Sequence, residues 1–130
     1  MNSTLDAVAK LILRLTLGIL ILLHGIAKLV HGIGPIENMV IGMGLPAFIA
    51  YGVFLGEVLG PILLIIGFHA RLGATLIAVN MLFAFLLAHT GELASLGPSG
   101  GWKLELQGMF LFTAVALALT GPGRFGINQR

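Results

Sequence analysis

The stretch that decides the fold is residues 45–68, LPAFIAYGVFLGEVLGPILLIIGF, an apolar run in which Glu57 is the only charged residue. A helix that crosses a bilayer needs about 20 mostly apolar residues, because about 30 Å of hydrocarbon must be bridged at 1.5 Å per residue. Every backbone polar group must also be hydrogen-bonded within the segment, since lipid offers it no partner. We therefore expect residues 45–68 to form one membrane-spanning helix.

Three further apolar stretches, at about residues 7–30, 72–89 and 104–120, are suited to the same role. Connectors rich in Gly and Pro separate the stretches, such as HGIGP at 31–35 and GPSGG at 97–101. No A-x-A-like cleavage site follows the first stretch, so we expect it to stay as a helix. The sequence predicts an all-α integral membrane protein, a four-helix bundle that forms a single domain over residues 1–130.

The composition excludes several classes of protein. Of the 130 residues, 58% are hydrophobic and 9% are charged, whereas charged residues make up about a quarter of a soluble domain. The net charge of +2 is too small and too scattered for a nucleic-acid surface. The chain has no cysteine, which rules out a disulfide, a thiolate nucleophile and a cysteine-ligated iron–sulfur cluster. Any redox chemistry would require a bound cofactor.

The distribution of charge predicts the orientation. Four crossings would place the N-terminus, the loop around Arg71 and the C-terminus on one side of the membrane. That side holds five of the seven Lys and Arg residues, namely Lys10, Arg14, Arg71, Arg124 and Arg130. By the positive-inside rule, both termini are expected to be cytoplasmic. Arg14 and Lys28 would snorkel outward from the first helix, and segment 36–43 would lie at the outer interface or in the bundle mouth.

Gly52, Gly56 and Gly60 form two overlapping small-xxx-small repeats in the second apolar run. Such repeats let another helix approach closely, and we expect the partner to be a helix of the same chain rather than a second copy. Pro61 follows directly and lacks a backbone N–H, so a kink is expected there.

The polar residues of the apolar runs gather in one half of the membrane. Taking each helix centre as the midplane, Glu57, Asn80 and Thr113 lie at nearly the same central depth. Most other polar side chains lie towards the outer face, and the cytoplasmic half holds far fewer, chiefly Arg14. Polar groups at such depths are expensive and therefore candidates for function. This pattern predicts a polar cavity in the outer half, with these ligand-binding candidates: His24, Lys28, Glu57, Asn80, His89, Glu105 and Gln107.

Depth also suggests which of these side chains pair. His24 is expected to contact Glu57, with Asn80 beside them, and Lys28 is expected to pair with Glu105. His24, Lys28 and His31 share one helix face, which we expect to turn inward. Alternatively, these polar pairs only hold the helices together, at about 1 kcal/mol each.

The histidines do not predict a metal or haem site. His24 and His89 are the candidate haem ligands, but they differ in depth by about 8 Å at 1.5 Å per residue. A metal site from His24, His89 and Glu57 has suitable ligand types without a recognisable spacing motif, so it is a less favoured alternative.

Taken in order, the landmarks of the chain resemble the DoxX family of small bacterial inner-membrane proteins. These landmarks are His24-Gly25-x-x-Lys28, Gly44-Leu45-Pro46, Glu57-x-x-Gly60 through Gly67 to Arg71, Met81-x-x-Ala84 to His89, Gly100-Gly101-x-x-x-Glu105 and Gly121-Pro122-Gly123-Arg124. The resemblance implies a multi-pass protein of the bacterial inner (plasma) membrane, with a link to thiosulfate:quinone oxidoreductase and to membrane oxidoreductase complexes in oxidative stress.

The chain departs from the family pattern after Arg124. The family usually continues with Ser-Leu-Asp, whereas this chain has Phe125-Gly126-Ile127-Asn128, so no role of that Asp is carried over. Nothing in the chain resembles the separate thiosulfate-handling subunit, and sulfur oxidation is therefore not implied.

The leading hypothesis is a redox-associated subunit that binds a quinone-like or other lipidic small molecule in the outer-half cavity. Glu57 would accept protons, His24 and Lys28 would donate hydrogen bonds, and His89 with Glu105 would form the mouth. The chain would be at most one subunit of a membrane oxidoreductase, without a covalent cofactor. Its partners would be the lipid bilayer, a membrane or peripheral oxidoreductase, and further copies of itself.

Two alternatives come from other classes of protein. Glu57 and Asn80 beside a glycine-rich, proline-kinked helix also suit a small-solute or proton-coupled transporter. A non-catalytic partner or anchor subunit, in which the polar cluster only stabilises the bundle, is the second alternative. The sequence identifies no catalytic residue.

Overall fold

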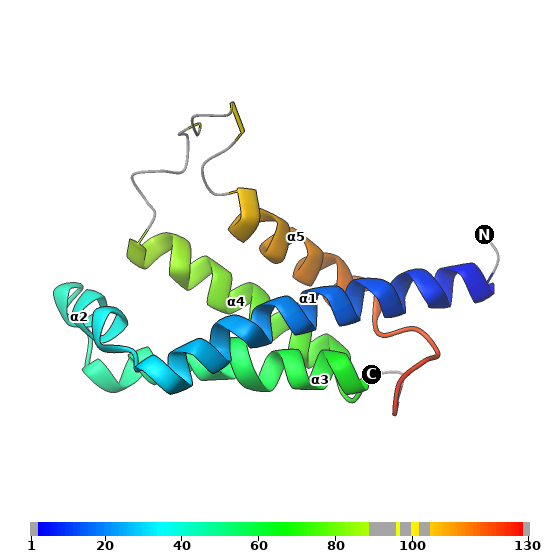
Figure 1. Ribbon diagram of the computed structural model, residues 1–130, viewed down its shortest axis with the longest axis horizontal. Coiled ribbons are helices and arrows are strands. Elements are labelled where there is room, and N and C mark those ends of the chain that lie inside the picture. Colours follow the sequence, from blue (N-terminus) through cyan, green and yellow to red (C-terminus); the bar gives the residue numbers. More distant parts are fainter. Residues whose placement is uncertain (1–2, 89–95, 97–99, 102–104, 129–130) are drawn as a thin grey trace.

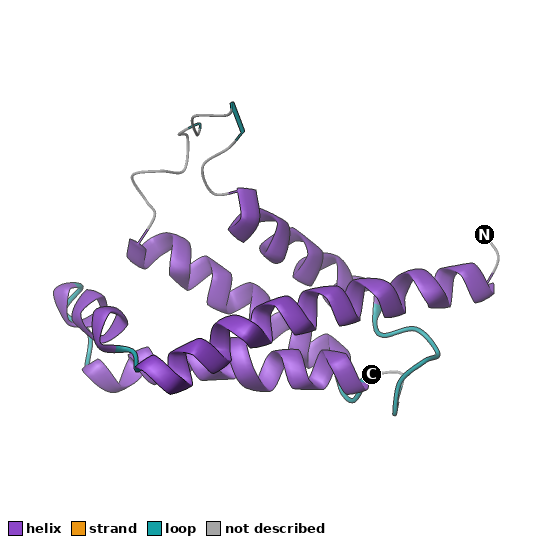
Figure 2. Cartoon of the chain, viewed as in Figure 1, coloured by secondary structure: helices purple, strands orange, loops and turns teal. Residues whose placement is uncertain are grey.

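The computed structural model describes residues 3–88, 96, 100–101 and 105–128, and all the elements in these ranges are helical (Figures 1 and 2). The helices are α1 (Ser3–His31), α2 (Gly34–Gly42), the 3₁₀ helix η1 (Ala47–Gly52), the π-helix η2 (Leu55–Leu59), α3 (Gly60–Ile66), α4 (Ala70–Ala88) and α5 (Glu105–Thr120). The all-α prediction is confirmed. The stretches expected at 7–30, 72–89 and 104–120 correspond to α1, α4 and α5.

Two helical stretches of the described chain, Ser3–His31 and Ala47–Ile66, are long and apolar enough to cross a membrane. Ala70–Leu86 and Glu105–Thr120 are shorter apolar helices. The outward faces of these helices carry many large apolar side chains, among them Leu23, Phe83 and Phe112. An apolar exterior of this extent suits contact with lipid.

The main core lies where α1, α3, α4 and α5 meet. α4 contacts both α3 and α5, and α1 contacts the same two helices (Figure 1). The core side chains are Leu17, Ile21, Leu64, Ala70, Ala74, Ile77, Ala78, Met81, Phe85, Phe110, Leu111, Ala114 and Leu117. Small alanines alternate with large residues on α4, which lets its neighbours pack closely on both sides.

Glycines set the closest helix approaches. A Cβ built on Gly60 would lie 2.9 Å from the carbonyl oxygen of Gly73, and one built on Gly73 would lie 2.7 Å from that of Gly60. On the opposite side of the same stretch, a Cβ on Gly25 of α1 would collide with the carbonyl group of Glu57. The expected packing within the chain is therefore confirmed at Gly60, whereas a Cβ on Gly52 would meet nothing within 4 Å.

The run expected at 45–68 is helical over Ala47–Ile66, but it is not one regular α-helix. It starts as the 3₁₀ helix η1, continues as the π-helix η2 and becomes α-helical at Gly60. The prediction placed the irregularity at Pro61, and the structure places it in the residues before Pro61. Pro61 has no N–H to donate to the carbonyl of Glu57, and Gly60 donates to the carbonyl of Leu55, the π pattern.

Arg14 corrects a prediction, because it is buried at 1% exposure and does not snorkel. Its Nε donates to the carbonyl of Leu64 at 2.9 Å and its Nη2 to that of Ile65 at 3.3 Å. Its Nη1 donates to the carbonyls of Pro122 at 2.9 Å and Phe125 at 2.7 Å. The last carbonyls of a helix lack partners within that helix, so the guanidinium finds acceptors at the end of α3 without reaching water.

The start of α1 and the C-terminal segment 121–128 lie at the same end of the molecule (Figure 1). The Nη2 of Arg124 donates to Oγ1 of Thr4 at 2.7 Å. The backbone N–H of Asn128 donates to the carbonyl of Gly67 at 3.2 Å, while its Oδ1 accepts from the N–H of His69 at 3.0 Å. Segment 121–128 therefore binds both the start of α1 and the turn between α3 and α4.

Replacing Gly60 by alanine should destabilise the protein, because the new methyl group would meet the carbonyl of Gly73. We expect a loss of about 1–3 kcal/mol in the free energy of unfolding, the usual effect of overpacking. Thermal or chemical unfolding in detergent measures it, with Gly52→Ala as the matched control from the same glycine repeat. Equal stability of the two variants would contradict the close approach of α3 and α4.

Replacing Arg14 by leucine should cost roughly 3 kcal/mol of stability, because several buried carbonyls lose a charged donor. Segment 121–128 should also become accessible to proteases, which limited proteolysis would detect. Lys10→Gln is the control on the same helix, since the Lys10–Asp6 ion pair is partly exposed. An Arg14→Leu variant as stable and protease-resistant as Lys10→Gln would show that these hydrogen bonds do not hold the segment.

Candidate ligand-binding site

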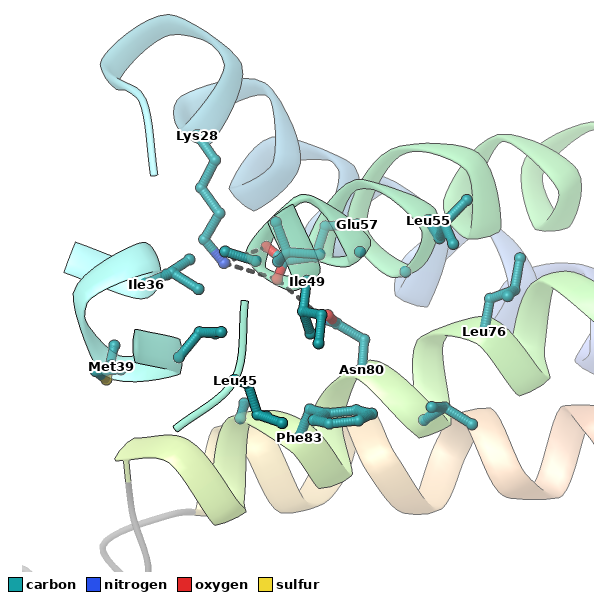
Figure 3. Close-up of a pocket in the computed structure, with 17 residues that line it drawn as sticks. Lys28, Ile36, Met39, Leu45, Ile49, Leu55, Glu57, Leu76, Asn80 and Phe83 are labelled. Atoms are coloured by element: carbon teal, nitrogen blue, oxygen red, sulfur yellow. Dashed lines mark hydrogen bonds and ion pairs between the residues drawn. The ribbon is translucent and has the colours of Figure 1, made fainter. Parts of the chain in front are cut away.

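The carboxylate of Glu57 is the centre of the site. Its side chain is 4% exposed, and Nζ of Lys28 lies 2.6 Å from each of its two oxygens. Nδ2 of Asn80 donates to Oε2 of Glu57 at 2.9 Å. Figure 3 shows Lys28 and Asn80 converging on Glu57 from different helices, so the cluster joins α1, η2 and α4.

Local backbone features bring these three side chains together. Glu57 lies inside the π-helix, a type of element that is frequent at functional sites. Gly25 lets α1 approach the backbone of Glu57, and Gly56 leaves the room that the stem of Asn80 occupies, since a Cβ on Gly56 would collide with that stem. Glycines therefore leave space next to Glu57 for α1 on one side and for the Asn80 side chain on the other.

A cavity of about 470 Å³ lies beside this cluster. Figure 3 shows Ile36 and Met39 of α2 on one side of the cavity, and Phe83 of α4 with Leu45 next to it on another. The remaining lining residues are Val40, Ile49, Ala50, Gly52, Val53, Leu55, Gly56, Leu76, Val79 and Ala84, with the polar residues Lys28, Glu57 and Asn80. The cavity is thus apolar except at the cluster, and its volume lies within the range of small-molecule sites.

A second, smaller cavity of about 160 Å³ lies behind the same ion pair. His24 and Gln107 supply polar groups to it, next to the aromatic ring of Phe110. Lys28 and Glu57 line both cavities. The ion pair therefore forms a wall that the two cavities share.

The predicted contact between His24 and Glu57 is wrong. Nδ1 of His24 lies 2.9 Å from the carbonyl oxygen of Leu20, and because that oxygen only accepts, Nδ1 carries the proton. The ring packs edge-on against Phe110 with centroids 5.8 Å apart. His24 therefore lines the smaller cavity but makes no hydrogen bond to the carboxylate.

The predicted pair of Lys28 with Glu105 is also wrong, because Lys28 pairs with Glu57. The prediction compared the depths of backbone atoms. The four-carbon stem of lysine can place its ammonium group about one helical turn above or below its own Cα along the membrane normal. Lys28 thus reaches inward to the centre instead of snorkelling outward. Of the three residues expected to turn inward, only Lys28 is half-buried, because His24 and His31 are both exposed.

The other candidates occupy different places. Asn80 lies beside Glu57 as predicted, and Gln107 lines the smaller cavity. Glu105 is exposed at the start of α5 and lines neither cavity. His89 lies outside the described residues.

Sequence reasoning missed how much of the main cavity α2 provides. Segment 36–43 was expected at the interface or in the bundle mouth, and the structure makes most of it a helix whose apolar face borders the cavity. The spacing of Ile36, Met39 and Val40, at i, i+3 and i+4, is the signal that could have predicted this face.

Comparisons with known proteins give a family and two relatives. The family model described as DoxX matches residues 9–90, a segment that contains Lys28, Glu57 and Asn80. "Putative oxidoreductase CatD" of Bacillus subtilis (strain 168) is 31% identical over 121 residues, which are 93% of this chain and 84% of that protein. "Inner membrane protein YphA" of Escherichia coli (strain K12) is 28% identical over 130 residues, covering 95% of this chain and 90% of that protein. No solved structure matches the chain.

The two partners of the ion pair should contribute unequally to stability. Lys28→Met leaves a buried carboxylate without its counter-charge, so we expect a loss of about 2–3 kcal/mol, below the 3–5 kcal/mol of a fully buried pair. Glu57→Leu should cost less, because the Lys28 side chain is already 31% exposed and can turn to water. The double variant should be more stable than Lys28→Met alone, as measured by unfolding in detergent.

Lys10→Met, which breaks a partly exposed pair on the same helix, serves as the control and should cost at most about 1 kcal/mol. If the effects of Lys28→Met and Glu57→Leu simply add, the two side chains are not coupled and the site as described is incorrect.

Proposed function

This chain belongs to the DoxX family of membrane proteins, and from that premise we propose that it is a redox-associated membrane subunit. Its ligand would be a quinone-like or other lipidic small molecule, bound in the cavity of about 470 Å³. The observation that carries the proposal is a charged cluster around the buried carboxylate of Glu57, on the wall of an otherwise apolar cavity.

The chemistry of the cluster suits the ring of such a ligand. An ammonium group has three donors, and Lys28 directs two hydrogen bonds at Glu57, so one N–H remains for an oxygen of the ligand. The apolar walls from α2, η1 and α4 would hold the ring and the start of an apolar tail. The ligand would thus be oriented with one oxygen at Lys28 and its tail along the apolar walls.

Proton exchange provides the second support. Interconversion of a quinone and its hydroquinone moves two protons with two electrons, so a group that accepts and returns protons is needed beside the ring. Glu57 is the carboxylate at this position, and the smaller cavity behind it adds the polar groups of His24 and Gln107. The name of the Bacillus subtilis relative, which includes the word oxidoreductase, agrees with this chemistry.

We propose that the protein crosses the bacterial inner membrane four times, through α1, residues 47–66, α4 and α5. The apolar exterior of the helices supports this topology, as does the name of the Escherichia coli relative. The two ends of the described chain lie together, and the excess of Lys and Arg at that end would place it in the cytoplasm. The main cavity would then lie in the outer half of the bilayer.

We propose that another protein supplies the electrons. The chain has no cysteine to relay them, and a protein of this kind supplies binding and orientation while a cofactor carries the electrons. We therefore propose a membrane or peripheral oxidoreductase as partner, together with self-association in the membrane.

Binding of decylubiquinone to the purified protein in nanodiscs tests the proposal. We expect Lys28→Met and Glu57→Gln each to weaken binding about tenfold or more, the effect of losing about 1.4 kcal/mol. Gly52→Leu should also weaken binding, because Gly52 lines the cavity and has open space around it, so a larger side chain can fill the site without disturbing the fold. Equilibrium dialysis measures all three affinities.

Lys10→Gln is the matched control and should bind like the unmodified protein. If all variants bind decylubiquinone equally, the main cavity is not its site. If Glu57→Gln lowers stability and leaves binding unchanged, the cluster serves to hold the helices together, as in the anchor-subunit alternative.

A further inference from the structure

We infer that the site selects the reduced, hydroxyl-bearing form of its ligand, a hydroquinone, over the oxidised quinone. The inference rests on the proposed function and deepens it, because it names the chemical form that the cavity recognises. It follows from the hydrogen-bond donors and acceptors that Glu57, Lys28 and Asn80 leave unused after they have bonded one another.

The orientation of the Asn80 amide is fixed by its partner. An ionised carboxylate only accepts hydrogen bonds, so the amide must present its Nδ2 to Glu57, as it does at 2.9 Å. The Oδ1 of Asn80 is on the other branch of the planar amide, and it accepts no hydrogen bond from the part of the chain that the structure describes. No side-chain oxygen of these residues is both buried and without a partner, so this Oδ1 is accessible. Asn80 lines the main cavity, so this acceptor is offered to a ligand.

Glu57 adds a further acceptor. Its Oε1 receives a hydrogen bond from Lys28, and its Oε2 receives one from Lys28 and one from Asn80. Each carboxylate oxygen has two lone pairs, so Oε1 keeps one of them. The wall of the cavity therefore presents acceptors on Asn80 and Glu57 beside a single remaining N–H of Lys28.

This set of groups distinguishes the two redox forms. The oxygens of a quinone only accept, so a quinone can use the N–H of Lys28 but sets its lone pairs against the acceptors of Asn80 and Glu57. A hydroquinone hydroxyl can accept from Lys28 and donate to Asn80 or Glu57. In an apolar cavity, an acceptor left without a donor is costly, and a site built to bond a hydroxyl rejects the analogue that lacks it.

The experiment compares duroquinone with durohydroquinone, which share ring and methyl groups and differ only by two hydrogens. Under anaerobic conditions, equilibrium dialysis against the protein in nanodiscs gives both dissociation constants. We expect the hydroquinone to bind at least tenfold more tightly. Since the reduced form is favoured, the midpoint potential of the bound pair should rise by about 30 mV for each tenfold preference.

The variant Asn80→Leu tests whether Asn80 contributes to the preference for the hydroquinone. This change keeps the size of the side chain and removes the Asn80 acceptor, together with the Nδ2 donor to Glu57. The hydroquinone should lose affinity while the quinone keeps or gains it. The ratio of dissociation constants should fall without reaching one, because the carboxylate of Glu57 still accepts from a hydroxyl. Val79→Ala, on the same wall but without a polar group, should leave the ratio unchanged. The ratio is taken on one preparation, so a partly folded variant lowers both binding capacities equally and does not change it.

The outcomes separate the inference from the proposed function. Equal binding of the two forms, or tighter binding of the quinone, overturns the inference and leaves a quinone-like ligand in place. A ratio of dissociation constants that is unchanged in Asn80→Leu removes the role of Asn80. If neither form binds, the proposed function fails for this ligand class, and the inference fails with it.

Discussion

The structure depends on how one buried carboxylate is neutralised. A charge taken out of water is tolerated only when it is paired and hydrogen-bonded, and Glu57 meets this requirement with Lys28 and Asn80. Pairing requires α1 and α4 to approach the same segment from two sides, which the glycines at positions 25 and 56 allow. The π-helix that contains Glu57 and the close approaches at these two glycines surround the carboxylate.

Two cations of α1, Lys28 and Arg14, bind their partners by different chemistry at the two ends of the molecule. Lys28 is a compact charge with three donors and is matched to a single carboxylate. Arg14 lies fourteen residues earlier, about 21 Å along a helix at 1.5 Å per residue, and spreads its donors over main-chain carbonyls from α3 and segment 121–128. Helix α1 is thereby hydrogen-bonded to the rest of the protein at two positions far apart along its axis. The hydrophobic core packs between these two positions.

The extent of α1, α4 and α5 could be predicted from the lengths of the apolar runs, because lipid and helix geometry allow few other solutions. The common depth of Glu57 and Asn80 was also predictable, since depth follows from position along a helix. The partner of Glu57 was not, because backbone depth neglects the reach of the Lys28 stem, and rotation about the helix axis leaves no simple trace in one sequence. Arg14 was misjudged for a different reason: snorkelling explained its charge, whereas its acceptors at the end of α3 and in segment 121–128 are brought close to it only by the fold. The π-helix had no sequence signal beyond Pro61.

The way Arg14 holds the tail has a consequence for how sequences of this kind can diverge. All four of its acceptors are main-chain carbonyls, which every residue possesses, so the side chains of Leu64, Ile65 and Phe125 are not what it recognises. What must persist is the path of the backbone, which passes through left-handed glycines at positions 67, 121 and 123. Substitutions should therefore be tolerated where side chains merely fill space and selected against at these glycines. Related chains should keep the backbone path of this region even where its sequence has changed.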